Sequence, residues 1–474
     1  MKQKSTLWFV LFLLFAINLK AELKLPSIFS DNMLLQQDVD VKIWGWGSKG
    51  DSLTIEPSWT SKKYFVVVNN NSKWELKINT PKASYESYRI IISSPTDKIV
   101  LNNILIGEVW LCTGQSNMEM PMKGFKNQPV EGSNLDILKA QNKNLRLLTV
   151  KRTSKLKPQD DFIGSWSEAS PEIVKDFSAV AYYFGELVQE ILDVPVGLIV
   201  SSWGGSWIES WMSKEMLSGF NEVKIPLKET DIKVPNRTAT TLYNGMINPL
   251  VGYSIKGCLM YQGESNYDRA KTYSSLLQTM VKEWRELWGQ GDFPFFYCQI
   301  APYNNPPEAH GNFSGAYLRE AQLQALDLIP NSGMAVLMDL GEENCIHPKN
   351  KKLVGERLAL LALGQAYERK GFAYKSPTLK SYEIEDSKMV LSFNDAPMWL
   401  TSYNKELSEF EIAGQDKVYY PAKANIKRSK VEVWSEKVPH PVAVRYAFKD
   451  FVVGDLFSTE GLPVSGFRTD DWNE

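Results

Sequence analysis

One serine of this chain has the surroundings of a nucleophile. Ser116 belongs to the segment Thr113-Gly114-Gln115-Ser116, which follows an apolar run typical of a buried strand. A glycine beside a serine at a strand-to-helix turn lets the backbone bend sharply and exposes the hydroxyl. The simpler interpretation is that Ser116 caps the following helix, a common role of serine. We take Ser116 as the candidate nucleophile.

The candidate base is His347. A serine hydroxyl is a poor nucleophile until a base accepts its proton. The chain has three histidines, of which His310 lies in a Pro-rich stretch and His440 in a predicted C-terminal strand. Only His347 follows a predicted strand of the central region, although a single loop histidine is more often structural. The pair predicts a serine hydrolase if the two loops meet.

Two further loops contain groups that could stabilise an oxyanion. Residues 202–206 include paired glycines, and residues 262–266 include an amide side chain. Backbone N–H groups and side-chain amides are the usual donors to a developing negative charge. We expect the N–H of Gly205 and the side chain of Gln262 to be such donors. Ser265 follows a similar glycine and is the alternative nucleophile.

The elements that must position these loops form an α/β pattern. From residue 104 to residue 371, apolar strands alternate with helical stretches, which predicts a mainly parallel sheet covered on both faces. Ligands bind beyond the carboxyl ends of such strands, where these loops lie. The predicted strands are 104–112, 194–201, 255–261, 293–300 and 334–340, and the predicted helices are 179–192, 273–288, 317–328 and 351–369.

The flanking regions have a different pattern. Residues 22–103 and 372–474 show short runs of period-two apolarity separated by turn residues, which predicts antiparallel β-sandwich segments. Residues 1–21 combine a Lys-containing start with a short apolar run, typical of a signal peptide. A buried or amphipathic first helix is the alternative. We therefore expect an exported protein, periplasmic or secreted.

Composition excludes several other functions. The net charge of −2 disfavours binding to nucleic acid or another polyanion. No metal-binding or cofactor-binding motif occurs, so neither a metal nor a cofactor is expected. No apolar stretch after residue 21 is long enough to span a membrane. The four cysteines are too sparse for a disulfide framework, so free thiols are expected, with a disulfide as the alternative. Nothing in the sequence indicates the oligomeric state.

Four segments resemble one known family, the sialate O-acetylesterases, which are carbohydrate esterases with the SGNH hydrolase fold. Supporting similarity extends over nearly the whole chain after residue 21. The resemblance implies a flavodoxin-like catalytic domain at 104–371, between the two β-sandwich segments, and hydrolysis of O-acetyl esters on sugars without a cofactor. The four segments are 107–118, 201–205, 261–266 and 346–351.

The family's functional residues can be carried over to these segments. The resemblance implies Ser116 as nucleophile and His347 as base, with an oxyanion hole formed by the N–H groups of Ser116 and Gly205 and the side chain of Gln262. An acyl-enzyme intermediate follows from this arrangement. The side chains expected to contact the sugar are Gln115, Asn117, Trp203, Asn248, Glu264 and Asn266.

One departure concerns the third member of a catalytic triad. SGNH relatives place an acid two or three residues before the histidine, where this chain has Cys345 and Asn344. Neither side chain can stabilise an imidazolium as a carboxylate does. Two hypotheses remain: a Ser-His dyad oriented by a backbone carbonyl, or a substitute acid. The candidate acids are Glu342, Glu343 and Asp339.

The substrate is open at this stage, because many acetylated sugars present the same ester. The alternatives within the esterases are an acetylxylan esterase and a pectin or rhamnogalacturonan acetylesterase. Outside the enzymes, the two β-sandwich segments and the missing acid leave a non-catalytic exported carbohydrate-binding protein as a further alternative.

Overall fold

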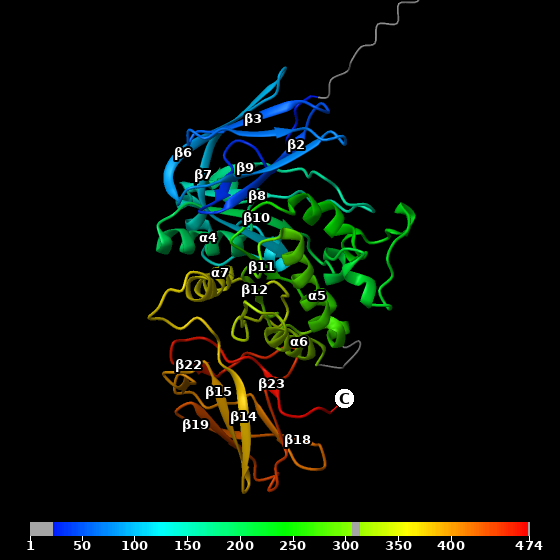
Figure 1. Cartoon of the computed structure of the whole chain (residues 1–474). Coiled ribbons are helices and arrows are strands. Elements are labelled where there is room, and N and C mark those ends of the chain that lie inside the picture. Colours follow the sequence, from blue (N-terminus) through cyan, green and yellow to red (C-terminus); the bar gives the residue numbers. More distant parts are fainter. Residues whose placement is uncertain (1–21, 306–312, 473–474) are drawn as a thin grey trace, which may run out of the picture.

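The computed structural model describes residues 22–305 and 313–472. The predicted signal peptide, residues 1–21, lies outside the described residues. The chain forms an elongated molecule with N-terminal strands at one end, α/β structure in the middle and antiparallel C-terminal strands at the other end (Figure 1). None of the helices in the described part of the chain has the length and apolarity to cross a bilayer.

The middle of the molecule is built on one sheet with the strand order β13-β12-β11-β7-β10-β8-β9. Neighbouring strands are parallel, except that β9 pairs antiparallel with β8 at the edge. The predicted α/β pattern is therefore confirmed for this region. The strands are β7 (Lys98–Gly114), β8 (Asn142–Thr149), β9 (Trp166–Ala169), β10 (Val196–Ser202), β11 (Gly257–Tyr261), β12 (Phe295–Cys298) and β13 (Ser332–Ala335).

Strand β7 is longer than predicted and connects two parts of the chain. Its first half pairs antiparallel with β6, and its second half lies between β10 and β11. Strand β6 also pairs with β3, so the N-terminal strands continue the central sheet. The remaining pair, β2 and β5, forms its own two-stranded sheet. The N-terminal strands are β1 (Leu34–Gln36), β2 (Asp40–Trp46), β3 (Ser52–Pro57), β4 (Tyr64–Val67), β5 (Lys73–Asn79) and β6 (Ser84–Ser93).

Helices cover both faces of the central sheet. Alternating residues of β7 point to opposite faces, so Trp110 packs with Phe184 of α4 while Leu111 belongs to the core under α5 and α6. Helix α4 packs against α7, and α5 against α6. The helices are α1 (Ser116–Glu119), α2 (Ser133–Lys139), α3 (Pro171–Val174), α4 (Ala179–Leu192), α5 (Ala270–Trp288), α6 (Ser314–Leu328) and α7 (Lys351–Leu361).

The C-terminal region consists of antiparallel sheets, as the period-two pattern predicts. One has the order β14-β15-β20-β19 and another the order β18-β17-β21-β23, while β16 pairs with β22. The strands are β14 (Thr378–Glu385), β15 (Lys388–Asn394), β16 (Leu400–Thr401), β17 (Phe410–Ala413), β18 (Tyr419–Pro421), β19 (Lys423–Lys427), β20 (Lys430–Trp434), β21 (Ala443–Tyr446), β22 (Phe457–Ser458) and β23 (Phe467–Arg468).

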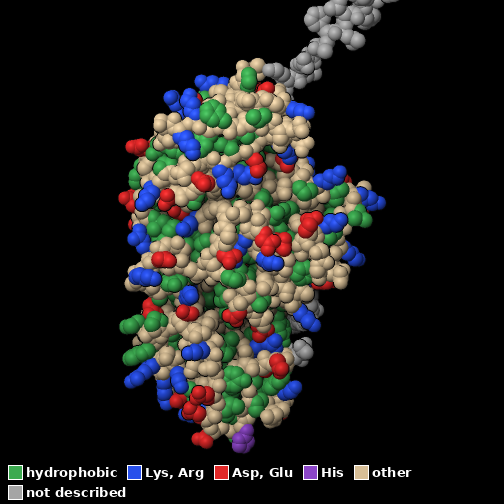
Figure 2. Space-filling view, viewed as in Figure 1, with side chains coloured by type: hydrophobic (Ala, Val, Ile, Leu, Met, Phe, Trp, Pro, Cys, Tyr) green, Lys and Arg blue, Asp and Glu red, His purple; other side chains and the backbone are tan. Residues whose placement is uncertain are grey.

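The cysteines and the surface also bear on the predictions. All four cysteines are free, as expected, and three of them are buried. On the face shown in Figure 2, basic and acidic side chains are interspersed rather than gathered into patches of one sign. The charges on this face therefore form no continuous basic track for a polyanion.

Candidate active site

Three of the predicted site loops begin at the same level of the sheet. Gly114, the last residue of β7, pairs in parallel register with Ser202 of β10 and with Tyr261 of β11. The carboxyl ends of these strands therefore coincide, and the loops that carry Ser116, Gly205 and Gln262 leave the sheet at one edge. This edge is the location where an α/β sheet binds ligands.

The turn before Ser116 requires glycine. Gly114 has φ +130°, and a Cβ atom there would lie 2.1 Å from the carbonyl oxygen of Tyr261. The N–H of Gln115 donates to the same oxygen at 2.9 Å. Ser116 is half-buried at the first position of α1, and the residue at the N-cap position is Gln115. Ser116 is thus not the cap of this helix, which removes the simpler interpretation of its position.

Buried amides hold the three loops together. The side-chain oxygen of Gln115 accepts from the N–H of Gly263 at 3.3 Å and from the N–H of Ser265 at 3.2 Å. The Gln262 side chain is 2% exposed and donates to the carbonyl of Ser206 at 3.1 Å and to Asn266 Oδ1 at 2.8 Å. These two bonds, and a longer one of 3.4 Å to Gln115 Oε1, use the amide nitrogen that was expected to face an oxyanion. In this structure the Gln262 amide therefore donates its hydrogen bonds to neighbouring protein groups.

The glycine loop after β10 lies directly against Ser116. A Cβ atom on Gly204 would be 3.2 Å from the Cβ of Ser116. The N–H of Gly204 donates to Glu119 Oε2 at 2.8 Å, and its carbonyl accepts from Asn236 Nδ2 at 2.7 Å. Gly205 follows with φ +70°. The two bonds fix the backbone of the loop at Gly204, next to the nucleophile candidate.

Asn117 connects the serine loop with the histidine loop. Its Nδ2 donates to the carbonyl of Ile346 at 3.0 Å, across 229 residues of sequence. The same side chain donates to Glu264 Oε1 and accepts from Lys351 Nζ. Because Asn117 follows Ser116 and Ile346 precedes His347, the two predicted catalytic loops meet at one edge of the sheet.

The imidazole of His347 has an amide partner. Its Nδ1 lies 2.6 Å from Gln128 Oε1, and its ring contacts the ring of Phe125 edge-on, with a centroid distance of 5.3 Å. Burial, together with the nearby charge of Lys351, lowers the pKa of His347 to about 4. The ring is therefore neutral at pH 7, the state that a base requires. No signal in the sequence pointed to Gln128.

The three candidate acids are placed elsewhere. Asp339 forms a two-bond ion pair with Arg357, at 2.6 and 2.7 Å. Glu342 accepts from the N–H of Lys349 at 2.9 Å, and Glu343 is exposed. Within the described ranges, no carboxylate is hydrogen-bonded to His347. The hypothesis of a substitute acid from these three residues thus finds no support in the geometry.

Two buried charges lie beside the candidate pair. Lys351 is 0% exposed, and burial lowers its pKa to about 8. Glu264 is also buried, which raises the pKa of its carboxyl group. Each is hydrogen-bonded to Asn117, so both charges act on the link between the serine and histidine loops. Clusters of buried groups with shifted pKa values in a cleft region are typical of functional sites.

The residues expected to contact the sugar fall into three groups. Trp203 is half-buried beside Ser202, with the guanidinium of Arg152 5.9 Å from its ring. Asn248 lies apart from the edge, because it lines a cavity next to Trp44 and Trp46 on β2, and donates to the carbonyl of Gln159 at 2.8 Å. The other four are buried and bond to neighbouring loops. These four are Gln115, Asn117, Glu264 and Asn266.

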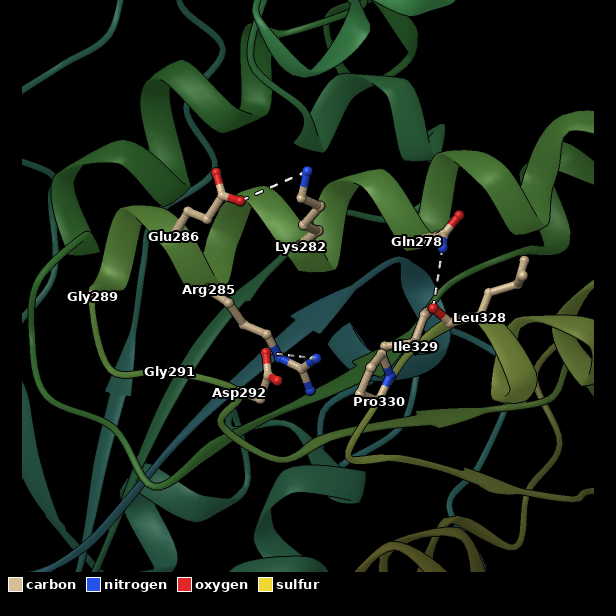
Figure 3. Close-up of a pocket in the computed structure, with 10 residues that line it drawn as sticks. All are labelled: Gln278, Lys282, Arg285, Glu286, Gly289, Gly291, Asp292, Leu328, Ile329 and Pro330. Atoms are coloured by element: carbon tan, nitrogen blue, oxygen red, sulfur yellow. Dashed lines mark hydrogen bonds and ion pairs between the residues drawn. The ribbon is translucent and has the colours of Figure 1, made fainter.

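Cavities occur at both ends of the sheet. One of about 300 Å³ lies at the carboxyl ends of the strands and is lined by Glu119, Phe125, Arg152 and Ser202 among others. Another, of about 680 Å³, is drawn in Figure 3 and opens beside Asp292 and Pro330, which precede β12 and β13. That cavity is at the amino ends of the strands, opposite Ser116. The residues that line the first cavity do not include Ser116 or His347, but two of them, Glu119 and Phe125, contact Gly204 and His347. The candidate active site is therefore at the carboxyl edge of the sheet, beside this cavity.

Comparison with known proteins identifies the family. A family model described as "Carbohydrate esterase, sialic acid-specific acetylesterase" matches residues 106–363. Sialate O-acetylesterase of Homo sapiens is 28% identical over 402 residues, covering 78% of this chain and 76% of the human protein. The mouse protein of the same name is 28% identical over 428 residues, covering 78% of both chains.

A solved structure is similar over almost the whole length. The crystal structure of a carbohydrate acetylesterase from Xanthomonas citri is 32% identical and has a TM-score of 0.87, covering 95% of this chain and 100% of that chain. The match includes the N-terminal strands and the antiparallel C-terminal sheets. With a family model that covers more than half of its residues, this chain belongs to the carbohydrate esterases described as sialic acid-specific acetylesterases, and it is an ester hydrolase.

Proposed function

We propose that this protein removes O-acetyl groups from sialic acid, with Ser116 as nucleophile and His347 as base. The observation that carries the assignment of residues is the hydrogen bond from Asn117 to the carbonyl of Ile346, which joins the two loops. The family description and the sialate O-acetylesterases among the relatives support the substrate.

The proposed reaction has two steps, in which Ser116 is the nucleophile and His347 transfers the protons. Neutral His347 accepts the proton of the Ser116 hydroxyl while the oxygen attacks the acetyl carbonyl. The N–H groups of Ser116 and Gly205 stabilise the oxyanion, and the protonated imidazole then donates its proton to the departing sugar oxygen. Water, deprotonated by the same imidazole, attacks the acetyl-enzyme. Acetate leaves, and the Ser116 hydroxyl is restored.

The Gln262 amide, the expected oxyanion donor, is hydrogen-bonded to neighbouring residues in this structure. Its amide nitrogen is bonded to the carbonyl of Ser206 and to Asn266 Oδ1. The carbonyl of Ser206 lies one residue after Gly205. We propose that Gln262 supports the oxyanion hole by holding the backbone beside Gly205, while direct donation to an oxyanion requires one of these bonds to open.

We further propose the domain division and location that the sequence predicts. An SGNH hydrolase domain at 104–371 lies between β-sandwich segments at 22–103 and 372–474, after a signal peptide at 1–21. The protein is then exported to the periplasm or the medium. Sequencing the N-terminus of protein recovered from a host cell's periplasm and medium tests both the cleavage site and the location.

Acetate release tests the catalytic proposal. Equal concentrations of the protein are assayed on O-acetylated sialosides, acetylated xylan and acetylated pectin, with p-nitrophenyl acetate as a neutral reference. We expect the highest kcat/KM on a sialoside, and a loss of about 10⁴-fold or more in the folded Ser116→Ala variant. Higher kcat/KM on xylan or pectin contradicts the substrate, and a folded but inactive wild type favours the carbohydrate-binding alternative.

A further inference from the structure

We propose that Gln128 is a positioning residue that replaces the acid of the usual triad. Its side-chain oxygen accepts the Nδ1–H of His347 and so leaves Nε2 unprotonated, the state in which it can accept the proton of Ser116. This inference rests on the proposed Ser116–His347 pair. His347 Nδ1 and Gln128 Oε1 lie 2.6 Å apart, which is the distance of a short hydrogen bond. The acceptor is neutral, unlike the carboxylate that it replaces.

The segment that carries Gln128 is built to hold this side chain. The N–H of Phe125 donates to the carbonyl of Gln128, and the reverse bond has the same length of 3.0 Å. Gly124 packs under this turn, where a Cβ atom would lie 2.4 Å from the Gln128 carbonyl oxygen. The turn thus presents the Phe125 ring and the Gln128 amide to the same imidazole.

A second contact joins the same segment to the histidine loop. The N–H of Glu131 donates to the carbonyl of Lys349 at 3.0 Å. Gln128 and Glu131 therefore hold the loop at two points, one on the His347 side chain and one on the backbone two residues later. The position of the imidazole is set by the tertiary contact of two loops rather than by the acid positions in its own loop.

The charged and titratable groups around His347 leave this role to Gln128. Burial and the charge of Lys351 of α7 lower the pKa of His347, and Glu264 of the loop after β11 is bonded to Asn117 and not to the imidazole. Within the histidine loop, Glu342 accepts from a backbone N–H. The Cys345 thiol of the same loop donates to the carbonyl of His347 at 3.2 Å.

Only one orientation of the amide is productive. With the oxygen toward Nδ1, the ring carries its proton on Nδ1 and Nε2 can accept the serine proton. The NH₂ group in that place would put the proton on Nε2 and remove the base. Because a neutral amide stabilises an imidazolium less than a carboxylate does, the histidine stays unprotonated to lower pH than in a triad with an acid.

Two variants of Gln128 test the inference on p-nitrophenyl acetate. Gln128→Met keeps the length of the side chain without a strong acceptor, and we expect kcat about 100-fold lower with KM nearly unchanged, since the imidazole loses its orientation. Gln128→Glu restores a carboxylate, and we expect kcat to remain within about tenfold of wild type while the acid limb of the pH profile of kcat/KM moves to higher pH. Gln141→Glu, which adds the same charge at an exposed position, should leave the limb unmoved.

The outcomes separate this inference from the proposed function. If Ser116→Ala and His347→Ala abolish activity while both folded Gln128 variants retain the wild-type kcat and acid limb, Gln128 has no positioning role and the Ser-His pair stands. If Ser116→Ala remains active, the proposed function itself is wrong. Equal loss in Gln128→Met and Gln128→Glu with no movement of the limb indicates a merely structural contact and also overturns the inference.

Discussion

Two buried clusters of charged side chains differ in how their charges are paired. In the C-terminal region, Arg445 contacts Asp470 at 3.1 Å, and Arg468 forms a two-bond pair with Glu320 of α6. Each charge there touches its opposite. At the candidate active site, Glu264 and Lys351 are both bonded to the neutral side chain of Asn117. That cluster joins its charges through an amide.

The pKa shifts reflect this difference. Burial raises the pKa of Asp470, but hydrogen bonds from Arg445 and Tyr419 outweigh it, and the net shift is downward. In the other cluster, burial dominates, so the pKa of Glu264 is raised and that of Lys351 is lowered to about 8. Direct pairing favours the charged forms, and in the C-terminal region it attaches Arg468 of β23 to Glu320 of α6. The active-site cluster leaves its charges poorly compensated, as is typical of functional sites.

Removing the amide at the centre of the active-site cluster should have the largest effect on activity. Asn117→Ala deletes the bonds to Ile346, Glu264 and Lys351, so the serine and histidine loops lose their link. We expect kcat on p-nitrophenyl acetate to fall about 100-fold in a folded protein. Asn142→Ala, which removes a half-buried amide at the start of β8, is the matched control. Equal activity of the two variants would contradict the role of Asn117 in joining the serine and histidine loops.

The second-largest effect is expected from removing the buried cation of Lys351, which should change the pH dependence of kcat/KM. In Lys351→Met, the charge that lowers the pKa of His347 is lost, so this pKa rises above about 4. We expect the acid limb of kcat/KM to move to higher pH, with a smaller change at pH 8. A limb that stays in place, in a variant shown by circular dichroism to be folded, contradicts the electrostatic coupling of Lys351 to the base.

A smaller effect is expected in the wild type between pH 7 and pH 5. With a His347 pKa of about 4, about nine-tenths of the base is unprotonated at pH 5, so kcat/KM should fall less than about twofold. An ordinary histidine pKa of 6.5 predicts a loss of about 25-fold over the same range. A pH profile in constant ionic strength distinguishes the two.

The C-terminal cluster should affect stability and leave activity unchanged. Arg445→Ala leaves Asp470 buried without its closest cation, which costs about 3–5 kcal/mol of the free energy of unfolding. Urea unfolding measures this loss, and kcat/KM at a temperature where the variant is folded should equal that of the wild type. Arg428→Ala, at an exposed position of the same region, is the control.

The amino-acid sequence alone determined which loops form the candidate site. Ser116, Gly205 and Gln262 follow strands of a recognisable α/β pattern, and parallel strands place their carboxyl ends at one edge. Local periodicity also predicted α4, whose observed bounds of Ala179–Leu192 match the expected 179–192. These features depend on contacts between near neighbours or on a general rule of sheets, so they can be read from residue order.

Only the tertiary structure decided which side chains meet across long separations. Strand β8 was missed because it carries Arg146, whose guanidinium is buried against partners distant in sequence, among them Asn32 and Asn103. Asp339 is paired with Arg357, and Asn248 lies at the N-terminal strands. The sequence of their own loops therefore did not show whether these two residues belong to the active site. The partner of His347 is an amide 219 residues away. Hydrogen bonding between distant segments leaves no periodic signal in the sequence, because it depends on how the loops pack after the sheet has formed.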